Sequence, residues 1–169
     1  LGVNIGPNKN SENRLKDYID CLKTFHQIAD YITINISSPN TEDLRKFHEQ
    51  TKLDELLQAI RKETKNLNSK VPRAVKVSPE IDNQEINKIV EVLLSNEIGA
   101  VIISNTSDSS RDSLSNIQKH QKGGLSGKPI EKKSSQLINK FYNLFNGRIK
   151  ILGVGGVDSG RSTYEKLLA

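Results

Sequence analysis

Residues 31–41 read YITINISSPNT, and this stretch decides the fold. It opens with an apolar-rich run, residues 31–36, of the kind that forms a buried strand in a parallel sheet. The polar side chains that close it are Asn35, Ser37, Ser38, Asn40 and Thr41. Parallel α/β proteins bind ligands beyond the carboxyl ends of their strands, so we expect these side chains on the functional face. The competing interpretation is an ordinary turn, because Asn, Ser and Pro are common turn residues.

The rest of the chain alternates short apolar runs with helical periodicity. Further strands are expected at residues 1–5, 74–77, 100–104 and 149–154. Apolar residues at helical spacing predict helices over residues 15–29, 53–60, 86–94 and 137–145. Asp82 and Glu85 form a capping-box pattern in front of the third of these helices. The alternation predicts a parallel α/β fold, and the pattern alone leaves open a barrel or an open sheet.

The composition bounds the class of protein. The 169 residues are enough to bury a core, and because they include no methionine we expect a fragment of a longer protein that starts directly in a strand. The sequence shows no signal peptide and no transmembrane run. The net charge of +5 comes from lysines interspersed with acids, so no nucleic-acid partner is expected, and a basic nucleic-acid surface is the lesser alternative.

Cysteine and histidine offer no metal or disulfide chemistry. Cys21 is the only cysteine, so the chain has no internal disulfide, and we expect the residue to lie in the core. The histidines are His26, His48 and His120. Their spacing does not match any set of metal ligands, so no metal site is expected.

Every expected strand ends in polar or glycine-rich sequence. The ends carry Asn4 and Gly6, the stretch quoted above, Lys76 and Ser78, Ser104-Asn105-Thr106, and Gly155-Gly156. Lys76 is the most informative, because a lysine within an apolar strand must face a polar cavity or an anionic partner. The alternative is a side chain that extends along the surface to water.

Two glycine clusters have the character of a phosphate site. The run GGLSG at residues 123–127 precedes Lys128-Pro129, and proline in a first helical turn leaves the preceding backbone N–H groups available to an anion. Gly155-Gly156 form the second cluster, and either cluster alone can serve turn geometry. Together with Lys76 they favour a phosphorylated cofactor. The polar loop 107–122 is long, and we expect it to act as a mobile lid.

These motifs resemble the dihydroorotate dehydrogenase family, in particular its class 2, quinone-linked enzymes. The matching stretches, in the family's order, are LGVNIG from Leu1, INISSPNT from Ile34, AVKVSP from Ala74, SNT from Ser104, GGLSGKP from Gly123 and GVGGV from Gly153. The resemblance covers nearly the whole chain and implies a (β/α)8 TIM barrel with FMN. Residues 1–169 are then expected to be a partial FMN-binding domain holding about strands 3 to 7, without strands 1, 2 and 8 and the family's N-terminal helices.

The resemblance also implies roles for single residues. Ser38 resembles the catalytic base that takes the C5 proton of dihydroorotate while the C6 hydride passes to flavin N5, and Thr41 resembles its relay through water. The residues similar to substrate-binding positions are Asn35, Asn40, Asn105 and Thr106. The residues similar to flavin-binding positions are Asn4, Asn35, Lys76, Ser104, Ser126, Gly127, Gly155 and Gly156. Lys76 matches the lysine near flavin N1 and O2, where its charge stabilises the reduced, anionic flavin.

The chain departs from the family pattern at two positions. Asp43 stands where glycine is common, and because Asp tolerates left-handed geometry we expect a similar turn. Ser104 stands where threonine is common, a mild change if the residue meets the flavin through its backbone.

The implied function is FMN-dependent oxidation of dihydroorotate to orotate, with quinone as electron acceptor, in pyrimidine (UMP) biosynthesis. Ser38 favours the quinone class, because the soluble class 1 enzymes use cysteine there and pass electrons to fumarate or NAD. A class 1 relative with a substituted base is the first alternative. A dihydrouridine synthase-like, RNA-modifying flavoenzyme is another, but that family requires a cysteine acid that is absent here. A non-catalytic barrel that only binds partners is the third.

The resemblance further implies where the protein acts. Its partners would be dihydroorotate, orotate and a quinone. It would attach peripherally to a membrane surface through segments outside residues 1–169. That surface would be the cytoplasmic face of a bacterial inner membrane, or the mitochondrial inner membrane in a eukaryote.

Overall fold

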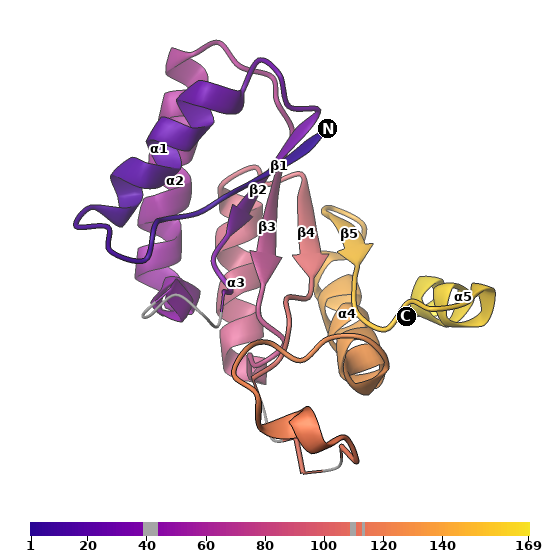
Figure 1. The fold of residues 1–169 in the computed structure, drawn as a ribbon. Helices are drawn as coiled ribbons and strands as arrows, with labels where there is room; N and C mark the ends of the chain where they lie inside the picture. Colours follow the sequence, from indigo (N-terminus) through magenta and orange to yellow (C-terminus); the bar gives the residue numbers. More distant parts are fainter. Residues whose placement is uncertain (39–43, 109–110, 113) are drawn as a thin grey trace.

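Strands and helices alternate along the whole chain in the computed structural model (Figure 1). The structure describes residues 1–38, 44–108, 111–112 and 114–169. The strands are β1 (Gly2–Ile5), β2 (Tyr31–Asn35), β3 (Arg73–Val77), β4 (Ala100–Ile103) and β5 (Lys150–Gly153). The helices are α1 (Arg14–Phe25), α2 (Gln50–Asn66), α3 (Asn83–Ser95), α4 (Glu131–Phe145) and α5 (Gly160–Leu168). Short 3-10 helices in the connections are η1 (Leu44–His48), η2 (Ile117–His120) and η3 (Lys128–Ile130).

Within the described ranges the strands form one five-stranded parallel sheet in the order β1-β2-β3-β4-β5. Each strand lies beside the one that precedes it, without the reversal of order that marks a doubly wound open sheet. Successive helices also contact each other in chain order, α1 with α2, α2 with α3 and α3 with α4. An order that never reverses keeps right-handed crossovers on one face, which is how successive βα units of a (β/α)8 barrel are arranged.

The core lies between the sheet and these helices. Ile34, Val75 and Val101 occupy one row across the sheet in direct register, and all three are fully buried. From the helices, Leu57 and Phe141 are buried in the same cluster. The apolar stripes expected from the sequence therefore do face the sheet.

The alternate strand positions point to the opposite face of the sheet, because side chains alternate along a strand. Asn35 lies in direct register with Lys76, and Asn4 lies in register with Thr33, two residues before Asn35. Asn4, Asn35 and Lys76 therefore share the face that the helices leave uncovered. In a closed barrel this face is the interior, and its carboxyl end holds the site.

The predicted strands and the four predicted helices are confirmed, with small changes at their ends. The first helix ends at Phe25, where His26 caps it, and does not reach Ala29. The capping box before α3 is present, with Asp82 accepting from the Glu85 N–H and Glu85 accepting from the Asp82 N–H, both at 2.8 Å. Cys21 is partly buried and packs against the core.

The sequence analysis did not anticipate α5. Its nine residues, GRSTYEKLL, carry too few apolar positions for a clear stripe, and Tyr164, Leu167 and Leu168 are exposed. A capping box between Ser159 and Ser162 begins the helix, so a local hydrogen-bond signal was present. No helix within the described ranges has both the length and the apolar character needed to span a membrane.

Candidate active site

Polar side chains from β2 and β4 meet at the carboxyl end of the sheet. The Asn35 side-chain oxygen accepts hydrogen bonds from the Ser37 N–H (3.2 Å) and the Ser37 hydroxyl (3.1 Å). The amide nitrogen of Asn105 in turn donates to the Ser37 hydroxyl oxygen (3.0 Å). Two residues predicted to bind substrate, 70 positions apart in the chain, are thus joined through one serine. β3, with Lys76, runs between them in the sheet.

Ser37 is the central residue of this network, and the sequence analysis assigned it no role beyond a place on the functional face. It is fully buried and makes hydrogen bonds on both sides, so it fixes the two asparagines relative to each other. Tyr18, a buried residue of α1, donates a hydrogen bond from its hydroxyl to the Asn35 backbone carbonyl (2.6 Å). Burial raises the pKa of Tyr18 well above its ordinary value, which keeps the phenol protonated as a donor.

Ser38, the predicted base, follows directly on Ser37 and is partly buried. Its backbone is therefore held within one residue of the hydrogen-bonded network, which restrains where its hydroxyl can reach. Asn40 and Thr41, predicted to bind substrate and to relay the proton, lie outside the described residues, as does the turn at Asp43. On the β4 side, the Thr106 N–H donates to the Asn105 side-chain oxygen (2.8 Å), which brings Thr106 to the same end of the sheet.

Lys76 is half buried at the carboxyl end of β3. Burial lowers the pKa of its ammonium, and this desolvation is the only cause of the shift. No described residue accepts a hydrogen bond from this side chain or forms an ion pair with it. A nearby anion would raise the pKa of Lys76 again, because it stabilises the charged ammonium. The position is therefore suited to a ligand that carries or develops negative charge.

The first glycine cluster packs directly on the end of β4. A Cβ atom on Gly124 would collide with the side chain of Thr106, so this position has room only for glycine. Ser107 and Leu125 form an antiparallel bridge, with Ser107 N–H donating to the Leu125 carbonyl at 2.9 Å. The loop 107–122 is thus closed at its base by this bridge, and its function as a lid stays a prediction.

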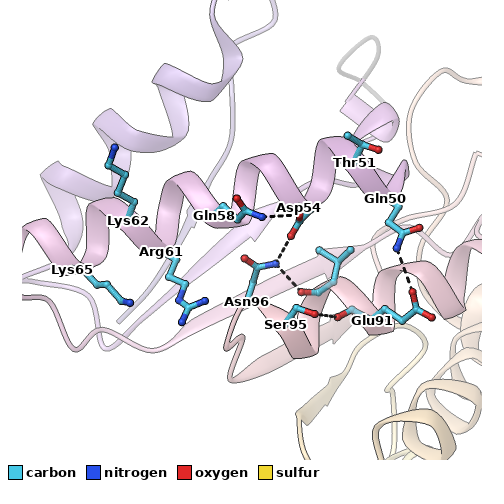
Figure 2. Close-up of a pocket in the computed structure, with 11 residues that line it drawn as sticks. Gln50, Thr51, Asp54, Gln58, Arg61, Lys62, Lys65, Glu91, Ser95 and Asn96 are labelled. Carbon is cyan, nitrogen blue, oxygen red and sulfur yellow. Dashed lines mark hydrogen bonds between the residues drawn. The ribbon is translucent and has the colours of Figure 1, made fainter.

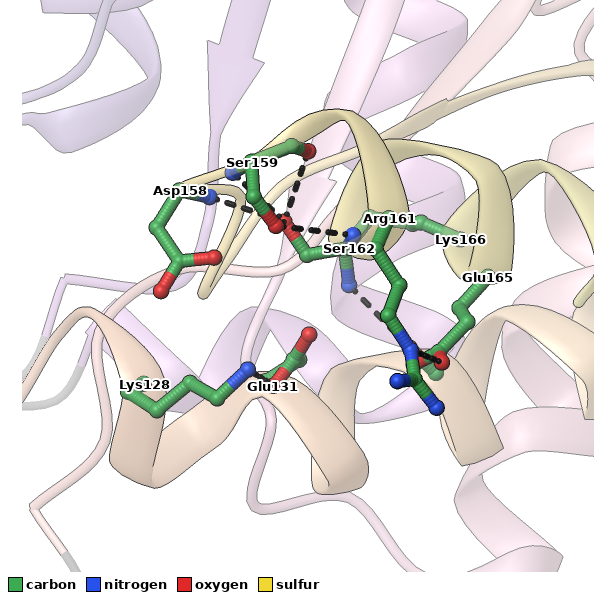
Figure 3. Close-up of polar contacts among 9 residues, drawn as sticks. Lys128, Glu131, Asp158, Ser159, Arg161, Ser162, Glu165 and Lys166 are labelled. Carbon is green, nitrogen blue, oxygen red and sulfur yellow. Dashed lines mark hydrogen bonds and ion pairs between the residues drawn. The ribbon is translucent and has the colours of Figure 1, made fainter.

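The second glycine cluster lies beside the first, across the start of α4. Gly155 and Gly156 have φ angles of 112° and 76°, and a Cβ atom on Gly156 would collide with Glu131, the first residue of α4. Gly127, with φ 77°, ends the first cluster and leads through η3 into the same helix start. The two clusters predicted to be phosphate sites therefore both lead to the start of α4. Figure 3 shows this helix start, with Lys128 and Glu131, beside the capped start of α5 at Ser159.

Charged contacts hold this region in place. The Lys128 ammonium forms an ion pair with the Glu131 carboxylate (Nζ to Oε2, 2.6 Å). Within α5, the Arg161 guanidinium pairs with the Glu165 carboxylate (Nε to Oε1, 2.9 Å; Figure 3). Lys166 is buried and donates to the hydroxyls of Ser134 and Ser135, both at 3.2 Å. The two Lys166 hydrogen bonds join α5 to α4, whereas the ion pairs Lys128–Glu131 and Arg161–Glu165 each lie within one local segment.

A second network, missed by the sequence analysis, ties the ends of β3 and β4 to α4. Glu80 accepts hydrogen bonds from the Lys133 ammonium and the Ser107 hydroxyl. Burial alone would raise the pKa of Glu80, but these two partners outweigh it and the pKa is lowered. In the sequence, the one feature that could have indicated this network is Glu80, a carboxylate two residues after Ser78 at the end of the strand.

The remaining predicted flavin positions are consistent with the same face but make fewer described contacts. Asn4 is exposed at β1, and Ser126 is exposed in the first glycine cluster. Ser104 is buried, its hydroxyl donates to the Asn105 carbonyl (3.1 Å), and its backbone N–H donates to the Val154 carbonyl (3.2 Å), so both of its donors are engaged within the protein. The donor set of a half-buried cation and glycine-rich turns fits a flavin with a terminal phosphate.

Comparisons with known proteins agree with this geometry. The family model described as Dihydroorotate dehydrogenase matches residues 1–169. Dihydroorotate dehydrogenase (quinone) from Idiomarina loihiensis is 41% identical over 175 residues, covering 100% of this chain and 52% of that protein. The protein of the same name from Pasteurella multocida is 42% identical over 176 residues, again with 100% and 52% covered.

Solved structures show the same relation. The ligand-free DHODH from Eimeria tenella superposes with a TM-score of 0.94 at 31% identity, over 99% of this chain and 50% of that one. The complex of the Eimeria tenella DHODH with ferulenol gives the same TM-score and identity over 98% and 49%. The chain spans about half the length of these relatives, and its fold is that of successive βα units of their TIM barrel. The chain belongs to the dihydroorotate dehydrogenase family.

Proposed function

We propose that the protein carrying this chain oxidises dihydroorotate to orotate with FMN and passes the electrons to a quinone. One observation carries the proposal: Asn35, Ser37 and Asn105 are hydrogen-bonded into one unit, and the half-buried Lys76, which has no partner among the described residues, lies on the strand between them. Side-chain amides beside a cation that has no partner among the described residues suit a cyclic amide substrate and a cofactor that becomes negatively charged on reduction.

The substrate would be held by side-chain amides. Asn35 and Asn105 each carry a carbonyl and an NH₂ group, so each is able to pair with either edge of a pyrimidine amide. Hydrogen bonds to Ser37 fix the side-chain oxygen of Asn35 and the NH₂ group of Asn105. The NH₂ group of Asn35 makes no hydrogen bond to a described residue, and the Asn105 oxygen, which accepts from the Thr106 N–H, keeps a second lone pair. We assign Asn40 and Thr106 to the same task, and Thr106 is supported by its N–H bond to Asn105.

Ser38 would remove the C5 proton. A serine hydroxyl is a weak base, so it needs a path for its own proton, and we assign Thr41 to that relay through water. Flavin, when bound, supplies a hydride acceptor for C6. Lys76 would offset the charge that then develops on the cofactor, and Asn4, Ser104, Ser126, Gly127, Gly155 and Gly156 would hold it. We further propose that residues 1–169 form part of one FMN-binding barrel domain.

Quinone as the acceptor is supported by Ser38 and by relatives that are named as quinone enzymes. Peripheral attachment to the inner membrane follows from that acceptor, because quinones reside in the bilayer. Segments outside residues 1–169 would make the attachment. Orotate production places the protein in pyrimidine synthesis.

The test is an acceptor profile of the purified full-length protein. We expect stoichiometric FMN and dihydroorotate-dependent reduction of a short-chain quinone, with little reduction of fumarate or NAD. Efficient turnover with fumarate or NAD would assign the protein to class 1. A protein without bound FMN, or without dihydroorotate oxidation with any acceptor, would contradict the proposed activity altogether.

Lys76→Ala is expected to weaken FMN retention and to slow flavin reduction by saturating dihydroorotate, on the order of a hundredfold, because it removes the positive charge that we assign to the reduced flavin. Flavin content after dialysis and single-turnover absorbance are the measurements. Lys88→Ala removes an exposed lysine from α3 and serves as the matched control. Unchanged flavin content and reduction rate in Lys76→Ala would mean that this lysine only extends to solvent.

A further inference from the structure

A basic pocket lies at the end of the sheet opposite the candidate active site. The last turns of α2, the start of β3 and the turn after α3 enclose about 500 Å³. Its charged lining residues are Arg61, Lys65, Lys70, Arg73 and Glu97. Four cations thus face a single carboxylate, and the polar groove between α2 and α3, which Arg61 and Lys65 also line, adjoins the pocket (Figure 2).

Both guanidinium groups have donors that the described residues leave unsatisfied. Arg61 pairs with the Glu97 carboxylate through Nη2 (2.6 Å), but its buried Nε has no hydrogen-bond partner. Arg73 donates through Nη2 to the Glu97 backbone carbonyl (3.4 Å), and its buried Nη1 has no partner either. Buried N–H groups on charged side chains are costly without an acceptor, and here two residues that line one pocket both retain hydrogen-bonding capacity that an anion would satisfy.

The charges that line the pocket also favour an anionic ligand. Burial lowers the pKa of Arg73, and the neighbouring Arg61 lowers it further, whereas Glu97 acts in the opposite direction. The single carboxylate is already paired with Arg61, so it does not neutralise both guanidinium groups. An additional anion would relieve the repulsion between them.

Stabilisation of helix ends does not account for these donors. Basic side chains often lie at helix C-termini, where backbone carbonyls lack partners. Here the last turn of α2 is already capped, with the Leu67 N–H donating to the Glu63 carbonyl and the Ser69 N–H to the Thr64 carbonyl, both at 3.0 Å. The free guanidinium nitrogens therefore remain without a structural role.

We propose that this pocket is a binding site for the phosphate group of a small soluble phosphate compound. Phosphate offers several strong acceptor oxygens, and two of them match the planar fork of an arginine guanidinium group. Lysine has no such fork and binds phosphate as a point charge. The rest of such a ligand would extend into the groove between α2 and α3, where Asp54, Gln58 and Asn96 present polar groups (Figure 2). The site is independent of the flavin and of the proposed reaction, because it lies at the other end of the strands.

The test uses the full-length protein with its flavin bound and inorganic phosphate as the probe, at constant ionic strength set with chloride. Phosphate is expected to raise the thermal unfolding midpoint beyond the effect of chloride, with a dissociation constant on the order of millimolar. The double variant Arg61→Gln, Arg73→Gln should weaken this binding at least about tenfold, and Arg73→Lys should also weaken it because the fork is lost. The control Lys9→Gln, Lys88→Gln removes the same charge from exposed sites and should bind as the parent does.

Three results would overturn the proposal. The first is a parent protein that responds to phosphate no more than to chloride. The second is a control variant that loses as much affinity as the arginine variant, which would show that net charge alone decides binding. The third is an unchanged affinity in both arginine variants, which would place the phosphate elsewhere, for example at the glycine clusters. If the double variant does not fold, Arg73→Lys decides, and unchanged affinity there is a negative result.

Discussion

Replacing Ser38 by alanine in the full-length protein is expected to slow flavin reduction by dihydroorotate by about 10²–10⁴-fold, the range for loss of a general base. Orotate should still bind, because Ser37 holds Asn35 and Asn105, two of the side chains that would contact it. The effect therefore belongs to the transition state, and it should appear in the rate of reduction and not in ligand affinity. Single-turnover stopped-flow absorbance of the flavin, together with an orotate titration, measures both.

Two further variants sharpen this test. Ser38→Cys should keep more activity than Ser38→Ala, since a thiol is still able to accept a proton. Ser95→Ala removes a hydroxyl whose described hydrogen bond goes to the Glu91 carbonyl. Ser95 is the last residue of α3, which leads to the amino end of β4 and not to its carboxyl end, so this variant should leave the rate unchanged. A Ser38→Ala protein that reduces its flavin at a near-normal rate would remove Ser38 from the mechanism.

Residues 1–169 produced alone are expected to aggregate or fold only in part, and not to retain FMN. In the described residues β1 and β5 each pair on one side only, so both edges of the sheet expose backbone donors and acceptors. Apolar side chains gather at the β5 edge, where Leu152, Val154 and Val157 are exposed. A cavity of about 600 Å³ there, between α4, β5 and α5, is lined by Ile138, Ile151 and Val157 among others. Barrel closure normally covers such surfaces.

Size-exclusion chromatography with flavin absorbance decides this point. The full-length protein, run in parallel, is the control and should elute as a yellow, defined species. The isolated residues should elute in the void volume or as a broad, colourless peak. A monomeric yellow peak with stoichiometric FMN would show that these βα units suffice without closure.

Much of the fold was readable from the sequence, because the relevant signals are local. Alternating apolar runs record which strand positions are buried, and Ile34, Val75 and Val101 are indeed fully buried in one row. The Asp82–Glu85 capping box is written within four residues and is present as expected. α5 was missed because its residues contact α4 along a short, mostly polar surface, and no apolar stripe reports that packing.

For the candidate site, too, local features were readable from the sequence, and contacts between distant residues were not. The sequence by itself determined which strand ends carry amides, a lysine and glycines, and its motifs pointed to the family that the comparisons then established. Only the tertiary structure decided that Ser37 joins Asn35 to Asn105 and that both glycine clusters meet at the start of α4. It also brought Arg61 and Arg73 to one pocket. These arrangements depend on strand register and helix packing, which set distances between residues far apart in the chain, and no local pattern encodes such distances.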